Sequence, residues 1–248
     1  MALLAILFLV TAVLYSSVGF GGVSTYLALL LIWQVPYFVF PVVALFCNII
    51  VVLGNCLNYI KAGNLNIKFL TPYLFGSIPL AFIGGSLNIE KKIFEILLFI
   101  VLLVAGTLLL LKFKSYEDKE ADYKKISVVN SVLIGSLLGF VSGVVGIGGG
   151  IFLSPILFLL RAGKPKHIVT AASIFILINS IFGIIGQLSK NNVLEEIPNY
   201  WYLLFIVFIG GQIGNFLNLK IFSTRALALV TAFLILFVAI RMGIRLLI

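Results

Sequence analysis

Charged side chains are scarce in this sequence. Asp, Glu, Lys and Arg make up 10% of the 248 residues, whereas 62% of the residues are hydrophobic. A water-soluble domain carries about a quarter charged residues, because polar side chains must cover its surface. The composition therefore excludes a soluble enzyme and a soluble nucleic-acid-binding domain. We interpret the net charge of +9 as topology information, since loops rich in Lys and Arg face the cytoplasm.

Cysteine and histidine are also scarce. Cys47 and Cys56 are the only cysteines, and at 100° per residue their spacing places them on opposite faces of a helix, which excludes a disulfide between them. We expect two small apolar side chains. His167, the single histidine, lies in a basic loop and is expected at the membrane interface. No metal-ligand spacing, paired carboxylate or Ser/His pair is present. The sequence therefore predicts no enzyme, no catalytic residue, no metal and no cofactor.

Long apolar runs dominate what remains. An α-helix needs about 20 apolar residues to cross a hydrocarbon core of about 30 Å, and charged or turn residues divide the chain into runs of that order. These runs predict an all-α polytopic membrane protein embedded in a lipid bilayer. The eight predicted segments are Ala2–Trp33, Pro36–Ile60, Phe69–Leu87, Ile93–Leu111, Ile126–Leu160, Ile168–Leu188, Tyr200–Ile221 and Ala226–Ile248.

The two halves of the chain resemble each other. The run Val18–Val23, with the sequence VGFGGV, matches Val145–Gly150, with the sequence VGIGGG, at an offset of 127 residues. Further matches follow in the same order: Asn48 with Ser173, Asn55 with Ser180, and Gly76 with Gly210. We infer a duplicated four-segment unit, which is typical of transporter folds.

The repeat predicts the domain organisation. Residues 1–111 form an N-terminal transmembrane repeat, residues 112–125 a cytoplasmic linker loop, and residues 126–248 a C-terminal transmembrane repeat. Each half opens with a segment that is too long for one crossing and is interrupted by glycines. Glycine in a helix interior costs about 1 kcal/mol relative to alanine, and lipid cannot satisfy the backbone groups that a break frees. We therefore expect both breaks to be buried in protein or to line a wet cavity.

Two geometries fit these broken segments. Each segment could cross the membrane once, which gives parallel repeats, or could form a re-entrant hairpin, which leaves three crossings per half and inverts the second half. The hairpin arrangement places twelve Lys and Arg on one side and five on the other, whereas single crossings divide them ten to seven. The positive-inside rule favours inverted repeats, with both termini outside and the linker in the cytoplasm.

The polar residues at membrane depth are neutral. Half-helices that resume near Ser24 and Ile151 would begin with unpaired N–H groups and the positive end of a helix dipole, which bind anions. Hydroxyl and amide groups can complete the contacts without the cost of burying a lysine. We predict a small oxyanion as ligand; a dehydrated cation held by the freed carbonyls is the competing use. The predicted binding residues are Gly19, Gly21, Gly22, Ser24, Thr25, Asn48, Gly146, Gly148, Gly149, Gly150, Ser173, Asn179 and Ser180.

Three stretches carry a resemblance to a known family. Ser142–Pro155, its weaker copy Ser16–Ser24 and Ala171–Ser180 resemble the TauE/SafE family of sulfite and organosulfonate membrane permeases, also described as the 4-toluene sulfonate uptake permease family. The first copy departs from the pattern at Val23, where a third glycine is usual, and at Asn48, where a small hydroxyl residue is common. The resemblance implies a permease in the cell membrane of a prokaryote that moves sulfite, thiosulfate or an organosulfonate.

The predicted mechanism is secondary transport by alternating access, with the anion near mid-membrane between the two breaks and a proton or sodium ion as possible coupling partner. No nucleic-acid partner is expected, and the sequence predicts no oligomeric state. Two alternatives stay open. One is a cation-coupled transporter or channel that uses the same breaks through their carbonyl groups. The other is an intramembrane sulfur-handling protein in which Cys47 is the nucleophile.

Overall fold

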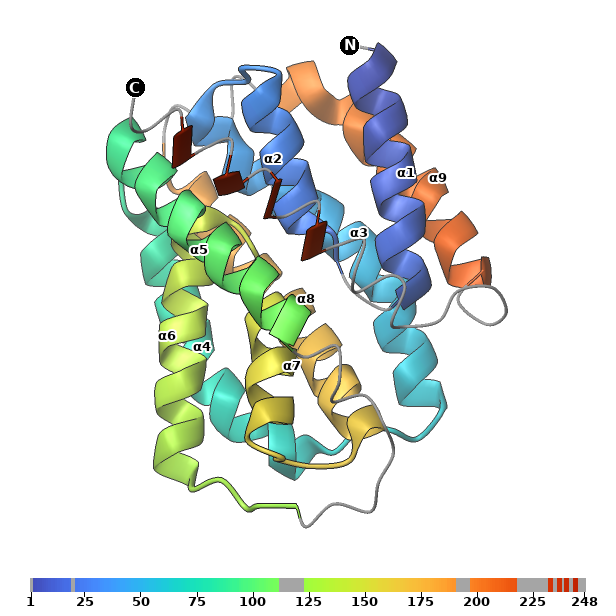
Figure 1. Cartoon of the computed structure of the whole chain (residues 1–248), viewed down its shortest axis with the longest axis vertical. Helices are drawn as coiled ribbons and strands as arrows, with labels where there is room; N and C mark the ends of the chain where they lie inside the picture. The colour runs from blue at the N-terminus through green and yellow to red at the C-terminus, as the bar shows by residue number, and fades with distance from the viewer. Residues whose placement is uncertain are drawn as a thin grey trace.

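The computed structural model describes residues 2–18, 21–111, 123–190 and 197–217, and the short pieces 232–233, 236–237, 239–240 and 243–244. Throughout these residues the regular structure is helical (Figure 1). Two short 3₁₀ helices, η1 (Tyr37–Val39) and η3 (Ile197–Tyr200), precede α3 and α9. The α-helices are α1 (Ala2–Val18), α2 (Val23–Ile32), α3 (Phe40–Lys61), α4 (Ile67–Ser86), α5 (Lys91–Leu111), α6 (Val128–Val145), α7 (Gly150–Leu159), α8 (Pro165–Leu188) and α9 (Trp201–Leu217).

Several helices are suited to a bilayer. Large apolar side chains point away from the protein, among them Phe75, Trp201 and Phe216, as expected for surfaces that face lipid. The prediction of an all-α polytopic membrane protein is thereby confirmed. The five stretches that are long and apolar enough to cross a membrane are Tyr37–Lys61, Ile67–Ser86, Val128–Val145, Lys166–Leu188 and Pro198–Leu217.

The first and fifth predicted segments each consist of two helices. α1 ends at Val18 and α2 begins at Val23, whereas α6 ends at Val145 and α7 begins at Gly150. The interruptions coincide with the two glycine runs. α2 and α7 have 10 residues each, about 15 Å of helix, which is too short to cross a membrane. The linker residues 112–122 and most of the eighth predicted segment lie outside the described residues.

The chain reverses direction at both breaks (Figure 1). Lys124, just before α6, donates its N–H to the carbonyl of Arg161, just after α7, at 3.0 Å, so α6 and α7 begin and end at the same end of the molecule. In the first half, the Tyr26 ring of α2 stacks on Phe8 of α1 at 4.8 Å. A straight continuation would separate these rings by more than about 20 Å at 1.5 Å per residue. Both pairs are therefore hairpins.

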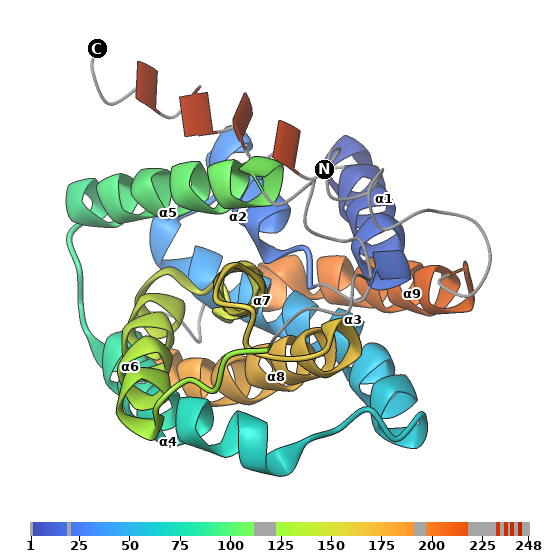
Figure 2. The same cartoon turned by 60° about the horizontal axis from the view of Figure 1, so that its bottom comes forward.

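The two hairpins lie on either side of α3 and α8, which cross at the centre of the molecule. α3 packs against α8 in the middle, with α4 and α6 on one side and α1 and α9 on the other (Figure 2). Glycines recur at four-residue spacing on α6, and a Cβ at any of them would meet a backbone atom of α4. Gly210 and Gly214 of α9 lie equally close to α1. Small residues of this kind let membrane helices approach backbone to backbone.

Three loops with basic residues in or beside them meet at one end of the molecule. The His167 Nδ1 atom lies 2.9 Å from the Asn64 carbonyl oxygen, and the Lys124–Arg161 hydrogen bond joins two further loops. The loops after α3, before α6 and after α7 therefore meet. They are the loops that the charge pattern assigns to the cytoplasm; this assignment and the inverted relation of the halves stay predictions.

Candidate functional site

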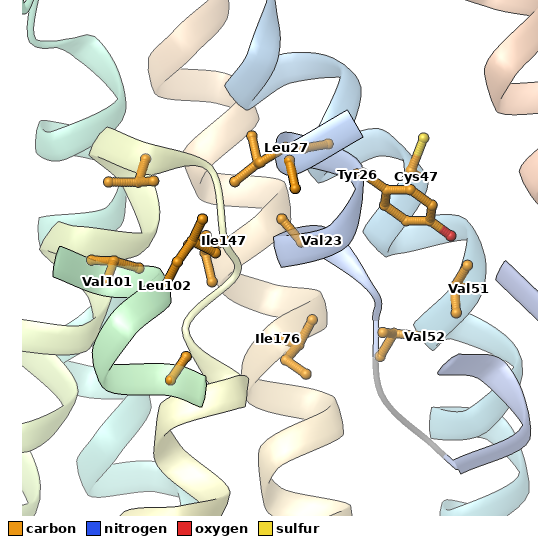
Figure 3. Close-up of a cluster of buried hydrophobic side chains, with 14 of the residues drawn as sticks. Val23, Tyr26, Leu27, Cys47, Val51, Val52, Val101, Leu102, Ile147 and Ile176 are labelled. Carbon is orange, nitrogen blue, oxygen red and sulfur yellow. The ribbon is translucent and has the colours of Figure 1, made fainter. Parts of the chain in front are cut away.

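The two breaks converge on one side chain, Asn48, in the middle of α3. A Cβ added to Gly21 would collide with the Asn48 Oδ1 atom, and one added to Gly148 would collide with Asn48 Nδ2. Asn48 itself is 1% exposed. Figure 3 shows the surroundings, with Val23 after the first break, Ile147 in the second, and Ile176 of α8 below them. A single amide therefore contacts both glycine runs, which are more than 120 residues apart in sequence.

Asn48 also joins the two halves. Its Nδ2 donates to the Ser180 Oγ of α8 at 2.9 Å, and both residues are buried. The repeat aligns Asn48 with Ser173, but the structure brings it to Ser180 because α3 and α8 cross. The Ser173 hydroxyl instead donates to the Val169 carbonyl of its own helix at 3.0 Å. Of the predicted polar ligands, Asn48 and Ser180 are thus brought together at the breaks.

The second break depends on backbone conformations that favour glycine. Gly146 (φ 82°), Gly148 (φ 74°) and Gly149 (φ 72°) all have positive φ, in the left-handed region that other residues rarely adopt. Gly146 ends α6 and Gly149 precedes α7. There is also no room for a side chain at Gly150, since a Cβ there would collide with the Ile176 side chain. These glycines were all predicted as site residues. Their backbone conformations form the break, and their lack of side chains lets it pack closely against α8.

The first break is held by side chains. Gly22 (φ 70°) is the N-cap of α2, and the Tyr15 ring lies about 3.0 Å from the position of a Cβ there. Tyr15 OH and Thr25 Oγ1 are 2.8 Å apart in a hydrogen bond. Thr25, predicted as a ligand, therefore closes the hairpin through this bond. Gly19, another predicted ligand, lies outside the described residues.

Both short helices start where the sequence predicted that half-helices resume, although the Gly150 N–H at the start of α7 donates to the Gly148 carbonyl at 2.9 Å. α2 begins at Val23 and α7 at Gly150, within one residue of the predicted positions. The N–H groups of Thr25 and Tyr26 both reach the Gly22 carbonyl, at 3.1 Å each. The N–H groups of Val23 and Ser24 precede them and have no acceptor within the helix. The positive end of α2 therefore faces the break beside Asn48.

Comparison with known proteins places the chain in a family. The profile of the sulfite exporter TauE/SafE family matches residues 3–242. The chain belongs to the TauE/SafE family. A probable membrane transporter protein of Sinorhizobium fredii is 26% identical over 233 residues, which are 94% of each chain. A probable membrane transporter protein of Bacillus subtilis is 25% identical over an alignment of 258 positions, gaps included, that covers 92% of each chain.

A third relative matches only in part. A probable membrane transporter protein of Methanocaldococcus jannaschii is 30% identical over 125 residues, 50% of this chain and 43% of its own. No solved structure matches the sequence. The names of the relatives agree with the family assignment, so this TauE/SafE protein is an integral membrane protein of a transporter family.

Several buried polar atoms at the TauE/SafE breaks have no hydrogen-bond partner among the described residues. They include the hydroxyls of Ser24, Ser142 and Ser154 and the side-chain oxygens of Asn48 and Asn179. The Nδ2 of Asn179 donates to the Phe175 carbonyl at 2.8 Å. An unsatisfied buried polar group costs about 1–3 kcal/mol, so water, an ion or a substrate is expected to satisfy these atoms. Ser142 and Ser154 were not predicted as ligands, although each lies four residues from a glycine of the second break.

The two cysteines are free and buried, as their spacing predicts. Cys47 is 0% exposed and lies beside the Tyr26 ring (Figure 3). Within the part of the chain that the structure describes, no group of three His, Cys, Asp or Glu side chains could hold a metal ion. The polar chemistry at the TauE/SafE breaks therefore consists of hydroxyls, amides and backbone groups.

Proposed function

We propose that this TauE/SafE protein is a secondary transporter for a small sulfur-containing anion such as sulfite, thiosulfate or an organosulfonate. The observation that carries the proposal is the convergence of both glycine breaks on Asn48, in the interior of a membrane protein. A buried meeting point of two interrupted helices is where transporters of this kind bind their substrates. The sulfur chemistry comes from the family's description as sulfite exporters.

Donor groups around the junction favour an anion. The start of α2 offers the Val23 and Ser24 N–H groups, and the Ser24 and Ser154 hydroxyls have no partner among the described residues. Helix N-termini and hydroxyls bind oxyanions without a buried lysine. Asn48 can take part as well. The Ser180 hydroxyl can donate or accept, so rotating the Asn48 amide by 180° would keep their hydrogen bond and turn the NH₂ group toward the first break.

The arrangement of the hairpins supports alternating access. The α1–α2 hairpin packs on α9 and the α6–α7 hairpin on α4, while α3 and α8 cross between them. We propose that the halves are inverted repeats and that one hairpin rocks against the crossing at a time. The Asn48–Ser180 hydrogen bond spans the halves, so substrate binding and release would change it. Such a bond can bias which side of the membrane is open.

Transport assays in proteoliposomes test this proposal. The wild-type protein should transport one or more of sulfite, thiosulfate and organosulfonates but should not transport chloride. Asn48→Ala should weaken apparent affinity about 10- to 100-fold, because hydrogen bonds to charged groups contribute about 1.5–3 kcal/mol each. Thr107→Ala is the matched control, since the Thr107 hydroxyl is exposed and bonds only to carbonyls of α5. Absence of flux for the whole panel, or full activity of Asn48→Ala, would contradict the proposal.

A specific observation favours a coupling cation beside the anion. The Asn179 side-chain oxygen is a buried acceptor without a partner among the described residues, and the Asn48 oxygen is a second one while its amide keeps the orientation that the structure shows. Acceptor oxygens coordinate sodium or accept from a protonated group, whereas an anion gains nothing from them. Sodium dependence of anion flux, lost in Asn179→Leu but kept in Thr107→Ala, would support sodium coupling. Flux that follows sodium in the absence of any sulfur anion would instead identify a cation transporter or channel.

A further inference from the structure

A second polar site lies at the end of the molecule opposite His167. A pocket of about 370 Å³ is bounded by η1, the start of α3, the α4–α5 connection and the ends of α6 and α8. Tyr37, Asn88, Gln187 and Lys190 supply its polar side chains. His167 stands at the start of the 24-residue α8 and Gln187 at its end. The volume is within the range of small-molecule sites, about 300–1,000 Å³.

Lys190 is held in place by two hydrogen bonds in series. Its Nζ donates to Gln187 Oε1 at 2.9 Å, and Gln187 Nε2 donates to the Gly143 carbonyl at 2.7 Å. Gln187 is 1% exposed and its amide is fixed, since both polar atoms are bonded. An ammonium group has three donors. One of them holds Gln187, which leaves two for a ligand in the pocket.

Burial makes this lysine unusual among those that the structure describes. Desolvation lowers the pKa of Lys190 to about 8, and no charged neighbour among the described residues contributes to the shift. Within the described ranges no carboxylate contacts this ammonium, and a partly buried ammonium is stabilised by any anion that reaches it. The pocket is therefore chemically matched to a small anion.

The pocket also borders the second break. Val144 lines it two residues before Gly146, and Pro41, another lining residue, lies so close to Gly146 that a Cβ there would collide with it. We propose that this pocket is an anion-recognition site on the face opposite His167, where Lys190, positioned by Gln187, captures the substrate before it reaches the breaks. This inference rests on the proposed anion transport and deepens it.

Transport measured separately from each side of the membrane tests the role of Lys190. For sulfite presented on the Lys190 face, Lys190→Gln should raise KM about tenfold with kcat unchanged, whereas KM on the His167 face should stay the same. Lys190→Arg should restore KM, because the charge is kept. Lys92→Gln is the matched control, since Lys92 is an exposed lysine at the start of α5 near the same pocket. Equal KM values for Lys190→Gln and wild type on the Lys190 face would overturn the proposal.

Chemical modification tests the site without transport. An amine-reactive ester at pH 8 should label Lys190 faster than exposed lysines, since more of Lys190 is neutral, and sulfite or methanesulfonate should protect it in phosphatidylcholine liposomes. Protection without any flux would contradict the transport proposal while retaining the anion site. Protection by phosphatidylglycerol but by neither anion would identify a lipid headgroup site, and no protection at all would exclude an anion site; both results would overturn the inference.

The pH dependence gives a third readout. Tyr37 and Lys190 are the titratable residues that line the pocket, and methanesulfonate keeps its charge across the range. Lysine is charged below its pKa, so affinity on the Lys190 face should be high below pH 8 and fall as pH rises through about 8. Lys190→Arg should remove the fall. A flat profile for the wild type would contradict capture by Lys190.

Discussion

The two glycine breaks occupy equivalent places in the predicted repeat but are built differently. The second break has three glycines with positive φ, at Gly146, Gly148 and Gly149, and packs directly against α8. In the first, Gly22 has positive φ, and the Tyr15–Thr25 hydrogen bond fixes the hairpin. Among the described residues, positive φ angles recur through the second break, whereas the first break combines one such angle with a side-chain hydrogen bond. The second break should therefore tolerate substitution less than the first.

The largest effect is expected from Gly148→Ala. A left-handed conformation costs a non-glycine residue about 1–2 kcal/mol, and overpacking adds about 1–3 kcal/mol, because the new Cβ would collide with Asn48 and lie 2.9 Å from Ser180 Oγ. We expect transport to be abolished. Gly63→Ala is the matched control, since Gly63 has φ 70° but nothing within 4 Å of its Cβ position. Anion flux and thermal unfolding should be measured for both variants. Equal flux and equal unfolding temperatures would contradict the inference that the space around Gly148 is crowded.

A smaller effect, with partial rescue, is expected at the first break. Gly21→Ala would collide with the Asn48 side chain, so we expect its cost to come from this crowding. Adding Asn48→Ala should therefore restore the thermal stability of Gly21→Ala while leaving Gly148→Ala partly destabilised. Thermal unfolding of the four single and double variants in detergent measures this difference. Equal rescue at both positions would show that the breaks do not differ in backbone strain.

Tyr15→Phe should have a modest effect, because it removes the hydroxyl that bonds Thr25. Hydrogen bonds between membrane helices contribute about 0.6 kcal/mol on average, so unfolding should shift slightly and transport fall a few-fold. Tyr26→Phe is the matched control, since the Tyr26 hydroxyl is buried without a partner among the described residues. A larger loss in Tyr26→Phe than in Tyr15→Phe would show that the Tyr15 bond does not fix the first hairpin.

The smallest effect is expected from Cys47→Ala. The thiol is fully buried beside Tyr26, so it should act as a small apolar group, and transport of sulfite and thiosulfate should be retained. Cys56→Ala, at the other buried free cysteine, is the control for loss of packing. If Cys47→Ala abolished flux while Cys56→Ala did not, Cys47 would have a chemical role and the intramembrane sulfur-handling alternative would be favoured.

Much of the fold was accessible from the sequence because a bilayer imposes strict rules. Apolar runs of helical length predict spanning helices, and glycine runs that lipid cannot solvate predict interruptions. Both interruptions occur where expected, and α2 and α7 begin within one residue of the predicted positions. The candidate site was predicted less fully. Tyr15 and Gln187 lie in apolar helices, and nothing in the local pattern indicates that one bonds Thr25 and the other Lys190.

The sequence by itself determined that this chain is a membrane protein and predicted two related halves, each with a broken helix, because hydropathy and glycine spacing are local properties. The charge pattern favoured hairpins at the breaks but left single crossings open. Tertiary structure alone decided between these two geometries, brought both breaks to Asn48, and bonded Asn48 to Ser180 instead of Ser173, the residue with which the sequence aligns it. These contacts depend on how α3 crosses α8. A crossing joins residues more than 120 positions apart, and no local pattern encodes its geometry.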